Sequence, residues 1–348
     1  MAEKRRILHI LPSNSFSGAE NVVCQIIQMF RDTPDTTMAY CCPEGPIRKA
    51  LEQRQIPYVP LKKFTPGEVL GAIRREKPTL IHTHDMLAAV VVSAVCGHIP
   101  MICHIHNNGF DSRKTTPKAV LFRLAARKAK HIFWVSSSAM DSYRFREAVA
   151  AKSTVLRNVI DADALRRRAE EAALQEPYDI LFLGRMSRPK NPLRLVEVLT
   201  AVAAAYPGLK AAIIGSGELE EEVAAAVAAS PARENIQMLG FQSNAYGMLK
   251  NAKLMIMTSL WEGTPMCALE AMALGVPIVS TPVDGLCDLV EPGRTGFLEG
   301  ENSGLTDRCL QILKDAGLRE TLSRNTLEKA AVILDTSAYK ACLEAAYQ

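Results

Sequence analysis

Short apolar runs that are typical of buried β-strands alternate with helix-forming segments along the whole chain. In the first half these runs include RILHIL, TLIHTH and MICHIH, and in the second half YDILFLG, KAAIIG and LMIMTS. Strands that alternate with helices form parallel sheets with right-handed crossovers and helices on both faces. Because the series restarts once, the sequence predicts an α/β protein built from two Rossmann-like domains.

The restart follows the segment NVIDADALRRRAEEAALQEPYDI, which is polar and helix-prone and contains Pro177. We therefore expect an N-terminal domain over 1–172 and a C-terminal domain over 173–348. A chain of 348 residues is too long for one ordinary core, which agrees with this division. Ligands of such proteins bind at the carboxyl ends of the strands, so we expect the site in a cleft between the domains.

The composition is that of a globular protein, with 48% apolar and 22% charged residues. No apolar run reaches the roughly 18 residues that span a bilayer, and the apolar part of the N-terminal segment is too short for a signal peptide. The nine cysteines include no CxxC pair and lie mostly in apolar segments, which indicates reduced thiols. These features predict a cytoplasmic protein.

Charge is divided unevenly along the chain. Residues 1–160 contain 23 Lys and Arg against 12 Asp and Glu (+11), whereas 161–348 contain 18 against 25 (−7). The cations are densest in 113–130, which is either a solvated helix face or a surface for an anionic membrane or acceptor. Aromatic residues are too sparse there for stacking on nucleic acid. Along this segment cations recur at helical spacing opposite apolar residues: Arg123, Arg127 and Lys130 against Val120, Leu121 and Leu124.

A cationic loop follows the strand YDILFLG. Arg185, Arg188 and Lys190 precede Pro192, which opens the next helix. Cations beside a helix N-terminus form an anion site, and the planar Arg fork suits phosphate. The alternative is a basic surface loop. After the following strand, the Gly-Ser-Gly turn at Gly215 either lets backbone approach a ligand or is simply a tight strand-to-helix turn.

The stretch WEGTPMCALE places two glutamates eight positions apart between apolar runs. We expect Thr264 to be the N-cap and Pro265 the first residue of a helix that ends at Gly275. The N-terminus of that helix would attract an anion, and Glu262 and Glu270 would accept hydrogen bonds from sugar and ribose hydroxyls. The alternative is one capping carboxylate and one ion-paired helix residue.

These motifs together resemble a known family. EGTPMCALE with its continuation AMALGVPIVSTPVDGLCDLVEPGRTGFL is similar to the Glu-x7-Glu signature of retaining glycosyltransferases of family 4, which have the GT-B fold. GRMSRPKN resembles the phosphate loop of that family, SGAENVV its glycine-rich loop, and RNVID the segment after its last N-terminal strand. The resemblance spans nearly the whole chain in the expected order. It implies two Rossmann-like domains facing each other across a cleft, with a C-terminal helix that packs back on the N-terminal domain.

The resemblance also implies roles for single residues. Arg185 and Lys190 would bind the donor diphosphate and stabilise the leaving charge without a metal or other cofactor, and Glu270 would bind the ribose. Glu262 and His106 would complete the catalytic set, with His106 against the donor sugar. His84 and Asn107 would line the acceptor side, and further donor contacts would come from Gly18, Gly215, Gly263, Thr264, Pro265 and Met266.

The reaction implied by the family is transfer of a hexosyl or N-acetylhexosaminyl unit from a nucleotide-diphosphate sugar, with retained configuration. The acceptor would be a saccharide or lipid-linked saccharide in surface polysaccharide synthesis, reached at the inner face of the cytoplasmic membrane through 113–130. No nucleic acid is expected as a partner. The alternatives are a nucleotide-sugar epimerase or hydrolase of the same fold and a non-catalytic nucleotide-sugar-binding protein.

Histidines are concentrated in one stretch, since five of the seven lie within 82–106. Alternation points His82 and His84 to one side of their strand, and likewise His104 and His106. Such histidines either bind a metal or are hydrogen-bonded in the core. One nearby carboxylate and the absence of HExxH-type spacing argue against a metal.

Two other patterns have simpler interpretations. The sequence DAD over 161–163 matches a metal-binding pattern of other glycosyltransferases, but it precedes a helix-forming segment, so we expect Asp163 to be a helix N-cap. Ser136 and Ser138 follow a strand without the glycines of a nucleophile elbow, which argues against a hydrolase.

Overall fold

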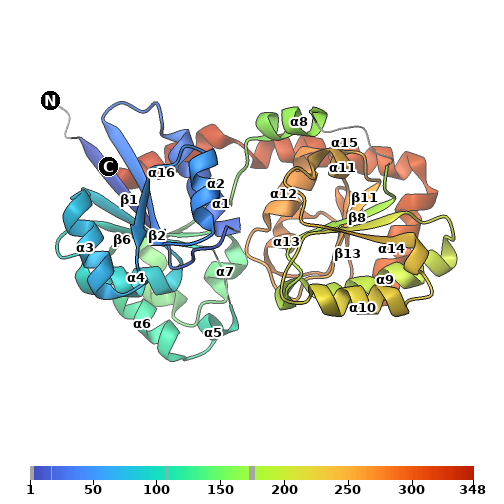
Figure 1. Cartoon of the computed structure of the whole chain (residues 1–348), viewed down its shortest axis with the longest axis horizontal. Coiled ribbons are helices and arrows are strands. Elements are labelled where there is room, and N and C mark those ends of the chain that lie inside the picture. The colour runs from blue at the N-terminus through green and yellow to red at the C-terminus, as the bar shows by residue number, and fades with distance from the viewer. Residues whose placement is uncertain (1–3, 17, 107–108, 172–176) are drawn as a thin grey trace. The chain divides into compact units, whose positions relative to one another are not determined.

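The computed structural model describes residues 4–16, 18–106, 109–171 and 177–348. The chain divides into two compact units (Figure 1). Unit 1 comprises Met1–Asn158 and Thr336–Gln348, and unit 2 comprises Val159–Asp335.

Unit 1 is built on a parallel sheet whose seven described strands have the order β3-β2-β1-β4-β5-β6-β7. The order reverses direction between β1 and β4, as in a doubly wound α/β fold. The strands are β1 (Arg5–Ile10), β2 (Thr36–Pro43), β3 (Tyr58–Leu61), β4 (Leu80–His84), β5 (Met101–Ile105), β6 (Ala129–Trp134) and β7 (Ser153–Val155).

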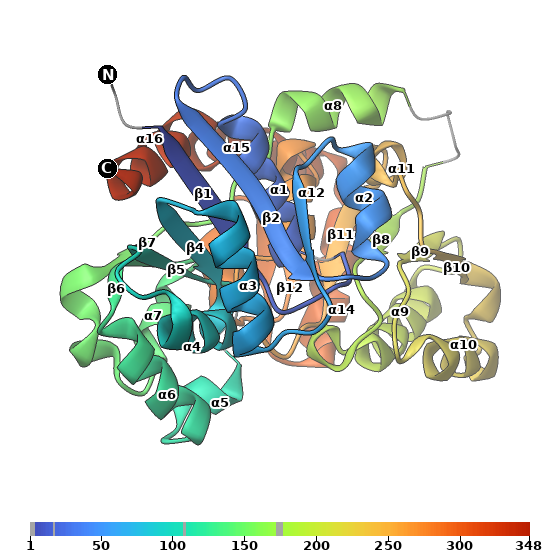
Figure 2. The ribbon, with the colours of Figure 1, turned by 60° about the vertical axis from the view of Figure 1, so that its left-hand side comes forward.

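Helices connect these strands and cover the sheet (Figure 2). They are α1 (Gly18–Met29), α2 (Ile47–Gln53), α3 (Pro66–Glu76), α4 (Asp85–Val95), α5 (Phe110–Arg113), α6 (Pro117–Ala126) and α7 (Ser137–Asp141), with the 3-10 turns η1 (Arg146–Ala148) and η2 (Ala150–Lys152). Every residue of β4 and β5 is buried, because a parallel sheet has both faces covered.

The C-terminal helix α16 (Thr336–Tyr347) belongs to unit 1. The hydroxyl of Tyr347 lies 2.8 Å from Nδ1 of His82, and its ring packs on Phe30. The Lys130 Nζ donates to the carbonyl oxygen of Ala346 at 3.1 Å. These contacts confirm that the C-terminal helix packs back on the N-terminal domain.

Unit 2 contains a second parallel sheet, with described strands in the order β10-β9-β8-β11-β12-β13. The strands are β8 (Ile180–Leu183), β9 (Ala211–Ile214), β10 (Ile236–Gly240), β11 (Leu254–Met257), β12 (Ile278–Ser280) and β13 (Gly296–Leu298). The helices are α8 (Ala162–Glu170), α9 (Pro192–Ala205), α10 (Glu220–Ala229), α11 (Tyr246–Lys250), α12 (Met266–Ala273), α13 (Asp284–Leu289), α14 (Asn302–Lys314) and α15 (Ala316–Ile333), with the 3-10 turns η3 (Arg188–Lys190) and η4 (Arg233–Asn235).

The boundary between the units lies between Asn158 and Val159, which is earlier in the chain than the expected boundary at 172. Helix α8 belongs to unit 2, where the Arg166 Nε donates to the carbonyl oxygen of Ala273 at 3.1 Å. Its N-cap is Asp161, whose carboxylate accepts from the Ala164 amide at 2.8 Å. The prediction that Asp163 is the cap was wrong, because Asp163 already lies in the first helical turn and pairs with Arg166.

Two smaller findings concern other expectations. The Ser136 hydroxyl accepts from the Ala139 amide and caps α7, which gives this serine a structural role. Among the described residues, no helix is both long and apolar enough to cross a membrane.

Candidate functional site

A buried ion pair lies at the carboxyl end of the unit 2 sheet. The Lys190 Nζ lies 2.5 Å from Oε1 of Glu262, and the two side chains are 16% and 10% exposed. The Ser259 hydroxyl donates to the same carboxylate oxygen at 2.7 Å, and the Cys267 sulfur lies 3.8 Å from the Lys190 nitrogen. The two motifs that the sequence predicted to bind a donor are therefore in direct contact.

Neighbouring strands bring these motifs together. Strands β8 and β11 are adjacent, so the loops that follow them leave the sheet side by side. The Thr258 hydroxyl donates to the carbonyl oxygens of Lys190 and Asn191, and the Leu260 amide donates to that of Pro189 at 2.7 Å. The loop carrying Lys190 is thus fastened to the loop carrying Glu262 by backbone as well as by side chains.

Burial and charge decide the protonation of this pair. Burial alone would lower the pKa of Lys190, but Cys267 and Glu262 more than offset it and raise the pKa above its ordinary range. Burial also raises the pKa of the Cys267 thiol to about 11, so the thiol stays neutral at physiological pH. Lys190 is therefore a permanent cation beside Glu262.

Arg185 supplies a cation of a different kind. It follows β8 and is exposed, and its guanidinium has no hydrogen bond or ion pair within the described parts of the chain. A planar guanidinium that is not committed to a protein partner can bind the oxygens of a diphosphate by two parallel hydrogen bonds.

Helix α12 begins beside the ion pair. Pro265 is its cap, with φ −70° and ψ 120°, and Met266 is its first residue. The prediction of Thr264 as cap and Pro265 as first residue was wrong by one position, because the backbone of Pro265 is still extended. Within the described residues no side-chain hydrogen bond caps this helix, so its N-terminus remains suited to an external anion.

Glu270 lies on the second turn of α12 and is mostly buried. The Tyr246 hydroxyl donates to its Oε1 at 3.2 Å, and the Arg168 guanidinium stacks 4.7 Å from the Tyr246 ring centre. Burial raises the pKa of the Glu270 carboxyl, which the Tyr246 hydrogen bond partly opposes. Glu262 and Glu270 thus have separate partners in the described structure.

Glycines let the loops of this site pack backbone to backbone. A Cβ on Gly215, which has φ +136°, would lie 1.9 Å from the carbonyl oxygen of Gly184. A Cβ on Gly285 would lie 1.6 Å from that of Gly263. The tight turn that the sequence offered as an alternative therefore accounts for Gly215, and its contact with donor stays a prediction. Sequence reasoning missed Gly285, although it follows strand β12 at the start of α13.

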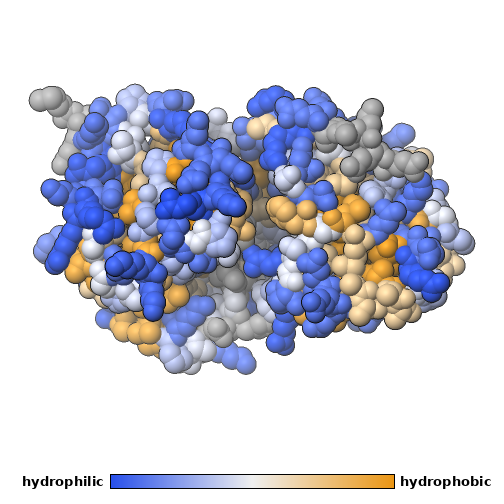
Figure 3. All heavy atoms as spheres, viewed as in Figure 1, coloured by the Kyte–Doolittle hydropathy of each residue, from blue (hydrophilic) through white to orange (hydrophobic). Residues whose placement is uncertain are grey.

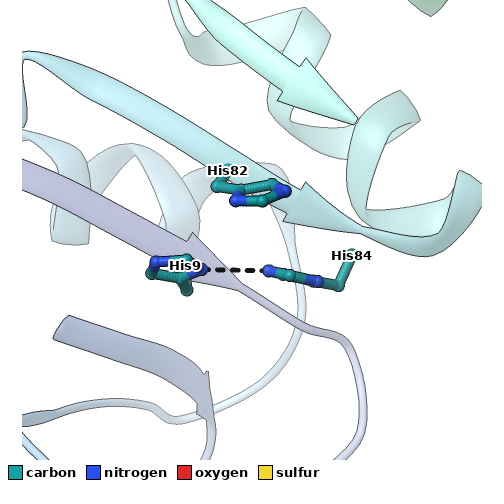
Figure 4. Close-up of side chains that lie close together, drawn as sticks. All are labelled: His9, His82 and His84. Atoms are coloured by element: carbon teal, nitrogen blue, oxygen red, sulfur yellow. Dashed lines mark hydrogen bonds between the residues drawn. The ribbon is translucent and has the colours of Figure 1, made fainter. Parts of the chain in front are cut away.

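The candidate site of unit 1 is a cluster of five histidines, of which four are buried and the fifth, His106, is partly buried. Neighbouring strands supply them on one face: His9 from β1, His82 and His84 from β4, and His104 and His106 at β5 (Figure 4 shows the first three). The predicted pairing of His82 with His84 and of His104 with His106 is confirmed, with ring centres 4.5 and 4.3 Å apart. Sequence reasoning missed His9. The signal that could have identified it is its position near the end of the first apolar run, RILHIL, like that of the other histidines in their strands.

Burial keeps these imidazoles neutral. It lowers the pKa of His9 and of His106 to about 3, and those of His82, His84 and His104 well below 6.5. Two hydrogen bonds link three of the rings, because the His84 Nδ1 lies 2.9 Å from the His106 Nε2 and the His84 Nε2 lies 3.0 Å from the His9 Nδ1.

The structure places the remaining predicted residues as follows. Gly18 is the first residue of α1. Thr264 is buried beside Gly263. Asn107 and Ser17 lie outside the described residues.

The basic segment 113–130 contains helix α6, whose valine and leucine side chains face outward, whereas Lys130 lies in β6 and not on the helix. Val120, Leu121 and Leu124 are 38%, 49% and 50% exposed, whereas Ala119, Phe122, Ala125 and Ala126 form the buried face. In Figure 3 hydrophobic spheres are visible over this helix, at the lower left.

Comparison with known proteins agrees with both units. The family model "Glycosyltransferase Family 4" matches 16–164, and the model "Glycosyl transferases group 1" matches 164–329. The alpha-D-kanosaminyltransferase of Streptomyces kanamyceticus is 25% identical over 297 residues, covering 76% of each chain. The UDP-Gal:alpha-D-GlcNAc-diphosphoundecaprenol alpha-1,3-galactosyltransferase of Escherichia coli is 21% identical over 325 residues, covering 85% of this chain and 84% of the relative.

Among solved structures, Anabaena Alr3699/HepE in complex with UDP-glucose superimposes with a TM-score of 0.84 at 20% identity, over 97% of this chain and 98% of that one. This likeness establishes the fold, two Rossmann-like α/β units of the GT-B type. The two family models together span nearly all of the chain, and it belongs to the family 4 glycosyltransferases.

Proposed function

We propose that this glycosyltransferase transfers a hexosyl or N-acetylhexosaminyl unit from a nucleotide-diphosphate sugar with retention of configuration. The observation that carries the proposal is the buried Lys190–Glu262 pair at the uncapped N-terminus of α12, in the same unit as the uncommitted Arg185. Cations and a helix N-terminus are groups that bind a diphosphate.

Each residue has a role in this reaction. Arg185 and Lys190 bind the diphosphate and stabilise the negative charge that develops as the bond between the sugar C1 and the phosphate oxygen breaks. Glu262 accepts hydrogen bonds from sugar hydroxyls, and Glu270 accepts them from the ribose. His106 contacts the donor sugar. The acceptor oxygen bonds to C1 on the face that the phosphate leaves, and its proton passes to the departing phosphate.

The leaving charge is neutralised by protein cations, so we propose that the transfer requires no metal ion. A saccharide or lipid-linked saccharide is the proposed acceptor, in keeping with the diphosphoundecaprenol-linked substrate named for the Escherichia coli relative. Surface polysaccharide synthesis is the corresponding pathway.

The test has three readouts. UDP-glucose, UDP-galactose and UDP-N-acetylglucosamine are screened by thermal shift, in EDTA, and we expect at least one to stabilise the protein. The product formed with that donor should have the α configuration by its anomeric proton coupling. Arg185→Ala should abolish transfer, with the exposed Arg233→Ala of η4 as the matched control. A fully active Arg185→Ala enzyme would refute the diphosphate role, and release of free sugar without acceptor would indicate a hydrolase.

We further propose that unit 1 contacts an anionic membrane through α6. Leu121 and Leu124 project outward. A hollow of about 330 Å³ lies beside this helix and is lined by Arg123, Arg144 and Arg146. Exposed apolar side chains beside cations are the pattern of helices that lie in a membrane interface.

Vesicle sedimentation tests this contact. Binding to vesicles containing phosphatidylglycerol should exceed binding to pure phosphatidylcholine, and it should fall when Arg144→Glu and Arg146→Glu are combined or when Leu121→Asp is introduced. The double variant Lys62→Glu and Lys63→Glu, at exposed cations outside this surface, is the control. Equal binding by all variants would refute the proposal.

A further inference from the structure

The histidine cluster of unit 1 contains a chain of three rings with a fixed proton count. His9, His84 and His106 are joined end to end by the two nitrogen–nitrogen contacts of 3.0 and 2.9 Å. A neutral imidazole carries one N–H hydrogen and one lone pair. Three neutral rings therefore bring three hydrogens to two hydrogen bonds, and one hydrogen remains at an end of the chain.

Only two nitrogens can hold that spare hydrogen, namely Nδ1 of His106 or Nε2 of His9. In the described structure both are buried and neither has a hydrogen-bond partner. If the spare hydrogen is on the Nδ1 of His106, each of the three rings carries its own hydrogen on Nδ1. If it is on His9, His84 and His106 carry theirs on Nε2. The two arrangements differ at every ring, so the end that is favoured decides the tautomer of His106.

The surroundings distinguish the two ends. His9 has no exposed surface, so an N–H at its Nε2 would remain buried without a partner. His106 follows the last residue of β5 and keeps some exposed surface as a residue, although its Nδ1 is buried, so a ligand can approach this end of the chain and not the His9 end. The arrangement with the spare hydrogen on His106 is therefore the one that a ligand can complete.

A backbone contact also holds the His106 end of the chain in place. The His106 amide donates to Oδ1 of Asp85 at 2.9 Å, which ties the end of β5 to the start of α4. Asp85 has φ +71°, a left-handed conformation that is costly for a residue with a side chain and persists where the surroundings impose it. This contact fixes the spacing between His84 and His106.

Stacked rings enclose the chain. The His82 ring lies over His84 with centres 4.5 Å apart, and the His104 ring lies over His106 at 4.3 Å. Both contacts are close to parallel, at 28° and 21°. The in-plane nitrogens of the chain therefore face each other and have apolar ring faces above them.

The same geometry distinguishes the chain from a metal site. Ligand nitrogens come within 4.8 Å of one another in two groups of three, His9 with His82 and His84, and His84 with His104 and His106. In Figure 4, however, His9 and His84 face each other in line, and the His82 ring lies above the pair. Lone pairs lie in the ring planes, so parallel rings direct them side by side and not toward a common point.

We propose that His9 and His84 are positioning residues that hold His106 as an Nδ1–H donor, with its Nε2 lone pair turned into the chain. The contact of that donor with a sugar hydroxyl rests on the proposed function, whereas the tautomer itself does not.

The test is the tautomeric state of the histidines in the intact, ligand-free protein labelled with ¹⁵N-histidine. Long-range ¹H–¹⁵N correlation spectra distinguish Nδ1–H from Nε2–H rings, and single variants assign the signals. His9, His84 and His106 should each show mainly Nδ1–H, because two hydrogen bonds join the three rings and only the His106 end of the chain belongs to a residue with exposed surface. A His106 ring with its hydrogen on Nε2 would overturn the proposal. The proposal would also be overturned if elemental analysis found stoichiometric zinc and if removal of that zinc changed these histidine signals.

Two variants at one position separate positioning from packing. The Asn amide in His9→Asn can donate to the Nε2 of His84, so His106 should keep its Nδ1–H tautomer. His9→Leu preserves volume without a donor, so a population of Nε2–H should appear at His106. An unchanged His106 tautomer in His9→Leu would count against the chain, and the wild-type spectra decide the matter if either variant fails to fold.

Addition of UDP-glucose to the labelled wild type separates this proposal from the proposed function. A shift of the His106 Nδ1 signal supports its contact with the donor sugar. If the three tautomers are as expected and UDP-glucose changes none of them, the positioning chain stands and the donor role of His106 fails.

Discussion

Acid should unfold unit 1 and leave unit 2 folded. All seven histidines lie in unit 1, at positions 9, 82, 84, 98, 104, 106 and 131, and five of them form the buried cluster. Burial lowers the pKa of these five, to about 3 for His9 and His106, whereas an unfolded histidine has a pKa near 6.5. As pH falls from 6.5 toward 3, the unfolded chain binds protons that the folded unit does not, so stability is lost in that window.

The size of the effect follows from proton linkage. At pH 5.5 each buried histidine that stays neutral costs about 1 kcal/mol of folding free energy relative to neutral pH. Five such residues cost roughly 6 kcal/mol, which is comparable to the whole stability of a domain. Unit 2 has no histidine, and its buried Glu270 has a raised pKa, which favours the folded state at lower pH.

The two tryptophans report on the two units separately. Trp134 is buried in unit 1, and Trp261 lies in unit 2. In a Trp261→Phe variant, fluorescence should report loss of native structure between about pH 5 and 6. In a Trp134→Phe variant, the remaining signal should stay native through that range. A Trp134 signal that stays native to pH 4, or two signals that change together, would refute the reasoning.

A single substitution refines the test. His104→Leu removes one titrating ring and keeps most of its volume, and neither ring nitrogen of His104 has a partner among the described residues. The pH dependence of unfolding free energy should decrease by about one proton, and the acid midpoint should move lower. His98→Gln, at an exposed histidine, is the matched control.

Three further predictions concern unit 2. Lys190→Met or Glu262→Gln alone should destabilise it by about 3 kcal/mol in urea unfolding, because each leaves a buried charge without its opposite charge, whereas the double variant should recover stability but remain inactive in transfer. Gly285→Ala should lower the melting temperature and donor affinity, since its Cβ would lie 1.6 Å from a backbone oxygen, while Gly300→Ala, with open space around it, should do neither. Glu270→Gln should unfold at the same or higher urea concentration at pH 7, because the raised carboxyl pKa makes ionisation costly in the folded state, yet it should bind the donor nucleotide more weakly by calorimetry.

Much of unit 2 could be predicted from the sequence. Lys190, Glu262 and Glu270 lie where strand, loop and helix signals succeed one another over a few residues, so local patterns locate them at strand ends. The exact first residue of α12 could not be predicted from the sequence. Whether Pro265 or Met266 begins α12 depends on one backbone angle of Pro265, which no local pattern specifies.

Other features depend on residues far apart in the chain. The outward direction of Leu121 and Leu124 could not be predicted, because the sequence places these leucines opposite Arg123 as the apolar face of a helix, and only the packing of α6 shows that alanines and Phe122 form the buried side. Similarly, the need for glycine at Gly285 arises from the backbone of Gly263, which belongs to a different loop.

By itself the sequence determined the α/β class, the two-domain plan and the residues of each motif, because apolar periodicity and turn chemistry act over a few positions. The tertiary structure alone decided that His9 meets His84, 75 positions later, since this requires β1 and β4 to be neighbours in the sheet. It likewise decided which ring nitrogens pair. Strand order and burial are properties of the assembled sheet, and the environment that keeps five histidines neutral exists only when the sheet is complete.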